Sequence, residues 1–89
     1  MPLSKKKKSQ IVEKFAREKK DTGSPEVQVA LLSAEIEALQ DHLNEHKGDS
    51  PAKVSLLGKV AKRRRLLRYF SAHNPDRYGK LIKKIGLKK

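Results

Sequence analysis

Five branched apolar residues in the middle of this 89-residue chain constrain its fold more than any other feature. They are Val29, Leu32, Ile36, Leu39 and Leu43. Their spacings of three, four, three and four residues place them along one side of an α-helix, as in a seam between two packed helices. We therefore predict a helix over about residues 25–45 that packs against an antiparallel neighbour.

Three further helices are predicted from apolar periodicity and from helix start signals. Their expected ranges are residues 4–18, 51–72 and 76–85, joined by short loops at about 21–24, 46–50 and 73–75. Ser24, Ser50 and Asn74 each precede a proline and are expected to cap the helix that follows. No segment alternates with period two for long enough to form a strand. The predicted fold class is all-α, with four helices: three long ones in an antiparallel bundle and a shorter N-terminal helix.

Each flanking helix carries an apolar stripe that is expected to face the bundle. In the first helix these residues are Ile11, Val12, Phe15 and Ala16. In the third they are Leu56, Leu57, Val60, Leu67 and Phe70, with Leu66 nearer the edge. In the fourth they are Tyr78, Leu81, Ile82 and Ile85. A chain of 89 residues suits one small domain, predicted over residues 1–89 with flexible ends at 1–4 and 87–89.

Composition excludes several classes of protein. The chain has no cysteine, so neither a disulfide framework nor a thiolate zinc site can stabilise it. The basic run Lys5 to Lys8 is not followed by an apolar stretch of seven residues or more, so we expect neither export nor membrane spanning. The small size also argues against a large catalytic cleft.

Charge is distributed in blocks along the chain. Lys and Arg minus Asp and Glu give +6 for residues 1–20, −6 for residues 21–50 and +12 for residues 51–89. These values sum to the net charge of +12. Two basic ends around an acidic centre indicate a polyanionic partner that is contacted by particular faces of the protein.

The third helix is expected to present a basic face opposite its apolar stripe. That face carries Gly58, Lys62, Arg65 and Tyr69, with Arg63 and Arg64 on either side of the stripe. Arginine forks bind phosphate, and a tyrosine ring can stack on a base, so the face suits a sugar-phosphate surface. A solvated basic face is the simpler interpretation. The stripe alone does not distinguish RNA from DNA or anionic lipid.

The second helix carries polar groups of a different kind. Gln28, Glu35 and His42 recur every seven residues and share one side, with His46 one turn beyond and Asp49 in the loop. An acid is repelled by phosphates, but it can accept a hydrogen bond from a base edge in the wide minor groove of A-form RNA. The histidines can instead be ordinary surface residues, or they can chelate zinc with Asp49, although Leu43 replaces the catalytic Glu of a metalloprotease helix.

The turn before the second helix supplies small and hydroxyl-bearing residues. It reads Asp21-Thr22-Gly23-Ser24 and leads directly into a helix N-terminus. Ser24 is expected to cap that helix. The backbone N–H groups and hydroxyls of such a turn can also bind an anion.

Five segments follow one another along the chain. They are Phe15-Ala16-Arg17, Asp21-Thr22-Gly23-Ser24-Pro25-Glu26-Val27-Gln28, Leu43 with His46-Lys47-x-Asp49, Lys62-Arg63-Arg64-Arg65-Leu66-Leu67-Arg68-Tyr69 and Pro75-Asp76-Arg77-Tyr78. Their joint occurrence in this order resembles the bacterial small-subunit ribosomal protein fifteen family over essentially the whole chain. The resemblance implies a non-enzymatic, cytoplasmic protein of the ribosome that binds small-subunit ribosomal RNA, bridges several RNA helices and nucleates the platform. It also implies a contact with large-subunit ribosomal RNA at the subunit interface and other platform ribosomal proteins as partners.

Site residues follow from the resemblance, position by position. For an RNA junction they are Thr22, Gly23, Gln28, Arg65 and Tyr69. For a minor groove they are His42 and Asp49. Supporting phosphate contacts are expected from Lys8, His46, Lys62, Arg64 and Arg68. No cofactor, metal, membrane or small-molecule substrate is expected.

The chain departs from the family in two places. Ser50-Pro51-Ala52 stands where relatives commonly have a His-His-Ser-like segment, so Ala52 lacks the usual hydroxyl, and Ser50 is expected to cap the third helix instead. Ser71-Ala72 stands where relatives often carry basic residues, which His73 replaces only in part. Two rival functions rest on the residues alone. They are DNA binding by the basic helix and a metal-dependent hydrolase built from His42, His46 and Asp49.

Overall fold

The structure, a computed structural model, describes residues 4–16 and 23–85 and consists of helices. They are α1 (Lys5–Phe15), α2 (Pro25–Glu45), α3 (Ser50–His73) and α4 (Pro75–Ile85). No strand occurs within these two ranges, which confirms the predicted all-α fold class. None of the helices in the described ranges combines the length and the apolar character needed to cross a membrane.

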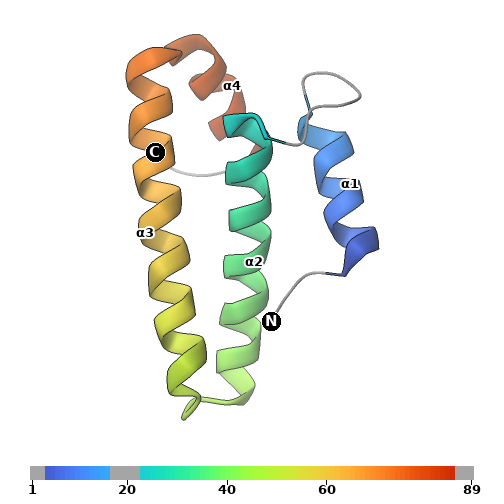
Figure 1. The fold of residues 1–89 in the computed structure, drawn as a ribbon, viewed down its shortest axis with the longest axis vertical. Coiled ribbons are helices and arrows are strands. Elements are labelled where there is room, and N and C mark those ends of the chain that lie inside the picture. The colour runs from blue at the N-terminus through green and yellow to red at the C-terminus, as the bar shows by residue number, and fades with distance from the viewer. Residues whose placement is uncertain (1–3, 17–22, 86–89) are drawn as a thin grey trace.

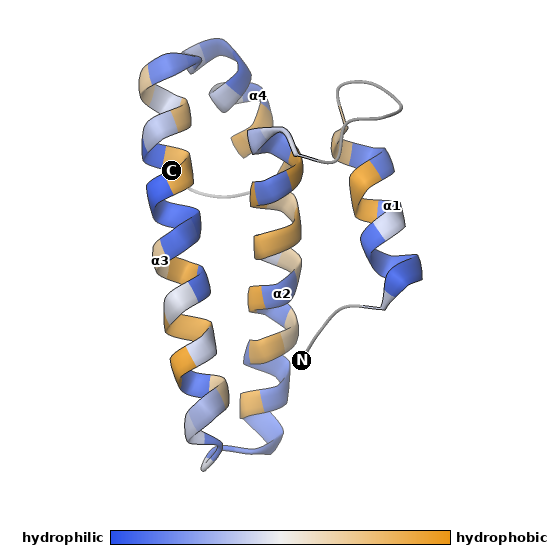
Figure 2. Cartoon of the chain, in the orientation of Figure 1, coloured by the Kyte–Doolittle hydropathy of each residue, from blue (hydrophilic) through white to orange (hydrophobic). Residues whose placement is uncertain are grey.

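The central element is α2, which lies between α3 and α1 (Figure 1). α2 and α3 form a long antiparallel hairpin, and α4 folds back beside the C-terminal end of α3 (Figure 1). Hydrophobic positions recur along the whole of α2 (Figure 2), and six of them are buried. They are Val27, Val29, Ala30, Leu32, Ile36 and Leu39. The apolar seam therefore faces the interior as predicted, with Leu43 half-buried at its end.

One end of the bundle holds a core to which all four helices contribute. Its buried residues are Val29 of α2, Phe70 of α3 and Leu81 of α4. Partly buried residues packed against them are Phe15, Leu66, Leu67, Tyr78 and Ile85. These positions confirm most of the apolar stripes that the sequence predicts. Leu57 is the exception, since it is 69% exposed.

Polar contacts connect the helices around this core. Arg77 of α4 donates two hydrogen bonds to the Glu26 carboxylate of α2, from Nε at 2.7 Å and from Nη2 at 2.6 Å. Its guanidinium carbon lies 5.2 Å from the centre of the Phe70 ring. A forked pair of this kind fixes both distance and orientation, so Arg77 orients α4 against the start of α2.

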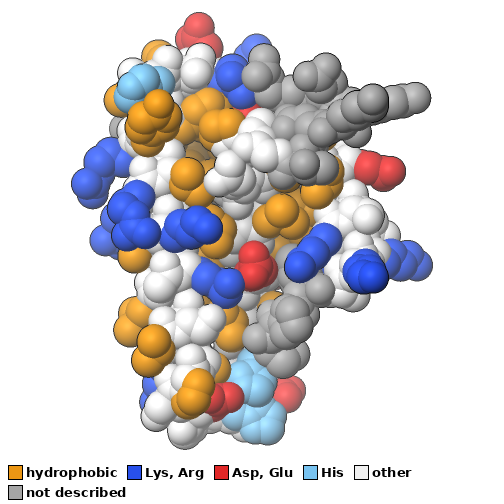
Figure 3. Space-filling model, viewed as in Figure 1, with side chains coloured by type: hydrophobic (Ala, Val, Ile, Leu, Met, Phe, Trp, Pro, Cys, Tyr) orange, Lys and Arg blue, Asp and Glu red, His pale blue; other side chains and the backbone are white. Residues whose placement is uncertain are grey.

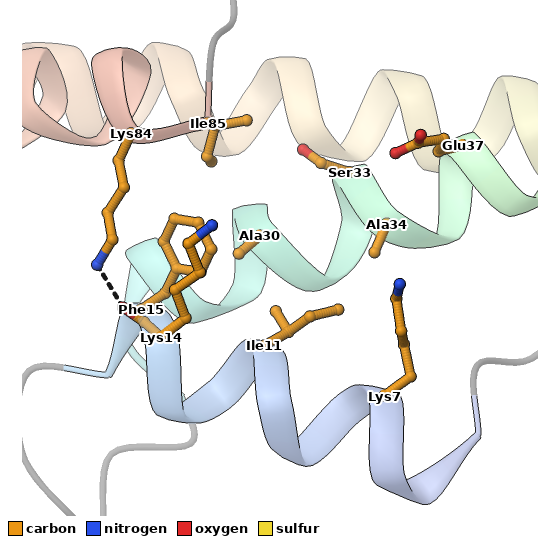
Figure 4. Close-up of a pocket in the computed structure, with 10 residues that line it drawn as sticks. All are labelled: Lys7, Ile11, Lys14, Phe15, Ala30, Ser33, Ala34, Glu37, Lys84 and Ile85. Atoms are coloured by element: carbon orange, nitrogen blue, oxygen red, sulfur yellow. Dashed lines mark hydrogen bonds between the residues drawn. The ribbon is translucent and has the colours of Figure 1, made fainter.

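α1 packs on α2 less deeply than α3 does, and none of its residues is fully buried. A cleft of about 250 Å³ lies between α1, α2 and the end of α4 (Figure 4). Its lining is apolar at Ile11, Phe15 and Ile85 and basic at Lys7 and Lys14. Lys84 of α4 closes one end, since its Nζ donates to the Lys14 carbonyl and lies 4.7 Å from the Phe15 ring centre (Figure 4).

The N-cap of α2 is Ser24, as the sequence predicts, but the N-cap of α3 is not the predicted Ser50. The Ser24 Oγ accepts from the Val27 N–H at 3.3 Å, as predicted. α3 is capped by Asp49, whose Oδ1 accepts from the Ala52 N–H at 3.1 Å, and Ser50 is the first helical residue. Asp and Ser are equally good caps, and a carboxylate is further favoured by the positive end of the helix dipole. The prediction of Ser50 as the cap is therefore wrong.

The other helix ends differ from the prediction by small amounts. α1 ends at Phe15 and not at about residue 18, because Ala16 has an extended backbone with ψ of 142°. Asn74 alone separates α3 from α4, and its carbonyl accepts from the Tyr78 N–H at 2.9 Å. Ser4 caps α1, which confirms the predicted start of the first helix, although the predicted flexible end at 1–4 also included this residue. The rest of the predicted flexible ends, residues 1–3 and 87–89, lies outside the described residues.

Truncating Phe70 should destabilise the bundle strongly. The side chain is 1% exposed and joins α2, α3 and α4 in one core, so Phe70→Ala should lower the free energy of unfolding by about 3–5 kcal/mol. Urea unfolding followed by circular dichroism measures the loss. Leu57→Ala on the same helix is the matched control, and it should change stability by less than about 0.5 kcal/mol. Equal losses for the two variants would contradict the core described here.

Candidate nucleic-acid interface

The outward face of α3 carries a concentration of positive charge. α3 contains no Asp or Glu in its 24 residues. Two of its cations face α2, because Lys59 Nζ donates to Glu35 Oε2 at 2.9 Å and Arg63 Nη1 donates to Ser33 Oγ at 3.1 Å. The remaining basic side chains are exposed, and Figure 3 shows blue side chains gathered over this helix.

The exposed set includes the basic residues that the sequence assigned to RNA. They are Lys62, Arg64, Arg65 and Arg68. None of these four side chains forms a hydrogen bond or ion pair with the part of the chain that the structure describes. Gly58 lies on the same exposed face, and a Cβ added there would meet nothing within 4 Å. Cations without an internal partner keep their full capacity to bind phosphate.

Tyr69 extends this face toward the end of α3. Its side chain is exposed, with 62% of its surface accessible, although it is large and partly apolar. The ring stacks on that of His73, with centroids 4.0 Å apart and planes inclined by 20°. This pair is not among the predicted site residues, although the four-residue spacing of Tyr69 and His73 places both on one face of a helix.

Gly23 and Gln28 meet at the start of α2. Gln28 Nε2 donates to the Gly23 carbonyl oxygen at 2.7 Å, which closes the turn onto the first helical residues. Because α2 and α3 run antiparallel, this turn and the C-terminal half of α3 lie toward the same end of the bundle (Figure 1). The structure thus brings four of the predicted junction residues to one end. The fifth, Thr22, lies outside the described residues.

The two minor-groove candidates contact each other at the opposite end of the hairpin. His42 Nε2 and Asp49 Oδ2 are 2.7 Å apart, and Asp49 Oδ1 accepts from Ala52. The hydrogen bond with His42, followed by that from the Ala52 N–H, lowers the pKa of Asp49 from its usual 3.8. His42 and Asp49 keep 21% and 34% of their side-chain surface exposed. The pair is therefore preorganised and still accessible to a ligand.

Neighbouring residues extend this second surface. The ring of exposed His46 lies 4.6 Å from that of His42, centroid to centroid, at an inclination of 31°. The Ser50 side chain is exposed, and its hydroxyl forms no hydrogen bond with any described residue. Ala52, in contrast, is buried. A side-chain hydroxyl near Asp49 is thus available from Ser50, because Asp49 has taken over the capping of α3.

The polar residues of the hairpin do not assemble a metal site. Within residues 4–16 and 23–85, no group of three or more His, Cys, Asp or Glu side chains is arranged to hold a metal ion. Both carboxylate oxygens of Asp49 already accept hydrogen bonds. Glu35, which shares a side of α2 with His42, is paired with Lys59. This ion pair connects α2 to α3.

Stability should depend on the ionisation of Asp49. A carboxyl group whose pKa is lower in the folded state stabilises the fold above its unfolded pKa, and this contribution disappears as the pH falls. Asp49→Asn keeps an amide oxygen for the cap but loses the charge. We expect wild type to exceed Asp49→Asn in stability at about pH 6, and this excess to shrink as the pH falls below 3.8 toward the lowered pKa of the folded state.

Urea unfolding of both proteins across this pH range measures the effect. Ser50→Ala is the control and should change stability little at either pH, because Asp49 caps the helix. A large loss in Ser50→Ala, or a constant difference between wild type and Asp49→Asn down to pH 3, would rule out this assignment.

Comparisons with known proteins place the chain by sequence similarity. Residues 7–88 match the family model described as Ribosomal protein S15. The chain is 48% identical over 89 residues to small ribosomal subunit protein uS15 of Natranaerobius thermophilus, covering 100% of both chains. It is 47% identical over 89 residues to that of Dictyoglomus thermophilum, again with 100% of both chains covered. It is 53% identical over 83 residues to that of Bordetella parapertussis, covering 93% of each chain.

Proposed function

Because the chain belongs to the ribosomal protein S15 family, we propose that it is a structural constituent of the small ribosomal subunit in the cytoplasm and binds small-subunit ribosomal RNA directly. The observation that carries the RNA contact is the outward face of α3. It combines exposed cations that have no partner among the described residues with the exposed ring of Tyr69. Proteins of this family are structural and not enzymes, and we assign no catalytic residue.

Two RNA-binding surfaces at opposite ends of the hairpin support a bridging role. The first, which we call the junction surface, comprises Gly23, Gln28, Arg65 and Tyr69, together with Thr22. The second, the minor-groove surface, comprises His42 and Asp49. About 20 residues of α3 separate Tyr69 from Asp49, which corresponds to roughly 30 Å along the helix. A rigid hairpin that binds RNA at both ends fixes the distance and angle between two RNA helices.

The two surfaces have different chemistry and therefore different tasks. Cations on α3 bind phosphates, which supplies affinity and orientation without reading sequence. The Asp49 carboxylate is repelled by phosphates, and the His42 imidazole is already paired with that carboxylate. They can accept or donate hydrogen bonds at base edges and 2′-hydroxyls in the shallow minor groove of A-form RNA. The minor-groove surface thus contributes selectivity for a folded RNA shape.

Further contacts belong to the same proposal. Lys8, His46, Lys62, Arg64 and Arg68 supply supporting phosphate contacts around the two surfaces. Bridging of several RNA helices nucleates the platform of the small subunit, where other ribosomal proteins join. A contact with large-subunit ribosomal RNA across the subunit interface completes the set of partners. The proposal includes no cofactor and no small-molecule substrate.

Variants of the two surfaces should separate shape recognition from general affinity. We expect Tyr69→Ala and His42→Ala each to weaken binding to a junction-containing fragment of small-subunit ribosomal RNA by about 10-fold, and binding to plain duplex RNA much less. Filter binding at fixed salt measures both affinities. Lys83→Ala, which removes an exposed cation from α4, is the control and should affect the two RNAs equally.

Two results would contradict the proposal. Equal losses on junction and duplex RNA would mean that neither surface recognises a folded shape. Duplex DNA that displaces the junction RNA at comparable concentration would favour a DNA-binding protein instead. The salt dependence adds a check, since affinity should fall by roughly 0.9 decade per phosphate contact for each decade of salt on duplex nucleic acid.

A further inference from the structure

We propose that His73 is a positioning residue of the junction surface, which covers one face of the Tyr69 ring and holds its other face ready to stack on an unpaired base of the RNA. The inference rests on the proposed function and extends it to a residue outside the predicted sites. His73 is exposed in the last turn of α3, one helical turn beyond Tyr69.

Two contacts hold the His73 side chain in place. Its ring lies nearly parallel to that of Tyr69, with centroids 4.0 Å apart. Its Nδ1 is 2.9 Å from the Tyr69 carbonyl oxygen. A carbonyl oxygen only accepts hydrogen bonds, so Nδ1 carries a proton and donates it. The imidazole cannot rotate about its side-chain bonds without losing the stack and the hydrogen bond together.

His73 therefore restricts the rotation of the Tyr69 ring and covers one of its two faces. The residue nevertheless keeps 62% of its surface exposed, so its opposite face and edge are open to solvent. An unconstrained surface tyrosine loses rotamer freedom when it binds a ligand, which weakens binding. His73 removes part of this loss in advance. The expected gain in RNA affinity is about two- to tenfold.

Charge around the ring pair favours RNA as the stacking partner. Arg65 and Arg68 precede Tyr69 by four residues and by one residue on the same helix, which contains no Asp or Glu, and both are exposed. Cations beside an exposed aromatic platform guide a nucleic-acid backbone so that its bases reach the ring. An unpaired base suits this arrangement, because a base within a duplex has both faces covered by its neighbours.

A purely structural role for His73 predicts a different experimental result. An imidazole in the last turn of a helix can stabilise the fold by bonding a terminal carbonyl and by complementing the helix dipole. Such a role would change the stability of α3 but not the RNA affinity of the folded protein. A direct phosphate contact by His73 would change affinity independently of Tyr69. The three possibilities are separable by experiment.

A double-mutant cycle on the full chain tests the proposal. Wild type, His73→Ala, Tyr69→Ala and the double variant are compared by filter binding to a junction-containing fragment of small-subunit ribosomal RNA. We expect His73→Ala to weaken binding about two- to tenfold in the wild-type background and to have no further effect in Tyr69→Ala. His73→Phe, which keeps a ring to stack but loses the hydrogen bond, should retain most of the affinity.

Two outcomes of the cycle would overturn the proposal. If His73→Ala binds the RNA fragment with wild-type affinity, His73 has only a structural role. A loss that persists in the Tyr69→Ala background would make His73 a direct contact. Ser71→Ala, in the same turn, controls for helix propensity, and circular dichroism verifies folding of each variant. If wild type itself fails to bind the fragment, the proposed function fails, which is distinct from a failure of the His73 assignment.

The stacking of Tyr69 on His73 can also be measured in the absence of RNA. The chain has two tyrosines, and Tyr78→Phe leaves Tyr69 as the single tyrosine in the NMR spectrum. The Tyr69 ring protons should move downfield when His73→Ala removes the ring current of the imidazole. Unchanged shifts would show that the stack is not populated in solution and would overturn the proposal.

Discussion

The fold depends on the burial of one helix against two neighbours at the same time. α2 contributes six buried apolar residues, with α3 on one side and α1 on the other. Removing these side chains from water supplies the non-directional stabilisation that a chain of this size needs. Val29 meets Phe70 and Leu81 at the end of the bundle where α4 folds back, so the same helix also determines where α4 packs. The positions of the functional surfaces follow from this arrangement.

The acidic centre of the sequence acquires a physical role in the structure. Glu26 binds Arg77 of α4, and Glu35 binds Lys59 of α3, so acids of α2 neutralise cations that face inward. The cations that point outward have no such partners among the described residues. α3 is thus paired with acids on the side that faces α2 and carries exposed cations on the opposite side. This asymmetry makes the electrostatic potential positive over the outward side, which attracts a polyanion to that side. We propose that the division of charge along the chain separates groups that hold the bundle together from groups that bind RNA.

The sequence predicts the helices and the buried side of α2 well, because a helix with a regular apolar side removes that side from water by packing it against other helices. It predicts caps less well. Ser50 and Asp49 are both suitable caps, and only the folded loop shows that Asp49 reaches the Ala52 N–H while it also binds His42. Leu57 lies one residue from the buried stripe, and its 69% exposure depends on how α3 is rotated against α2. Similarly, residues at a four-residue spacing share a helix face, but rotamers decide whether rings such as those of Tyr69 and His73 stack.

The central claim is that one rigid hairpin holds two RNA-binding surfaces at a fixed separation. Hydroxyl-radical footprinting of the purified chain on small-subunit ribosomal RNA tests it most directly, because cleavage reports each protected ribose. We expect two separate protected regions, a helical junction and a nearby minor groove, that appear together at the same protein concentration. Protection of a single region, or weak protection spread along the RNA, would contradict a two-surface clamp and leave only general electrostatic binding.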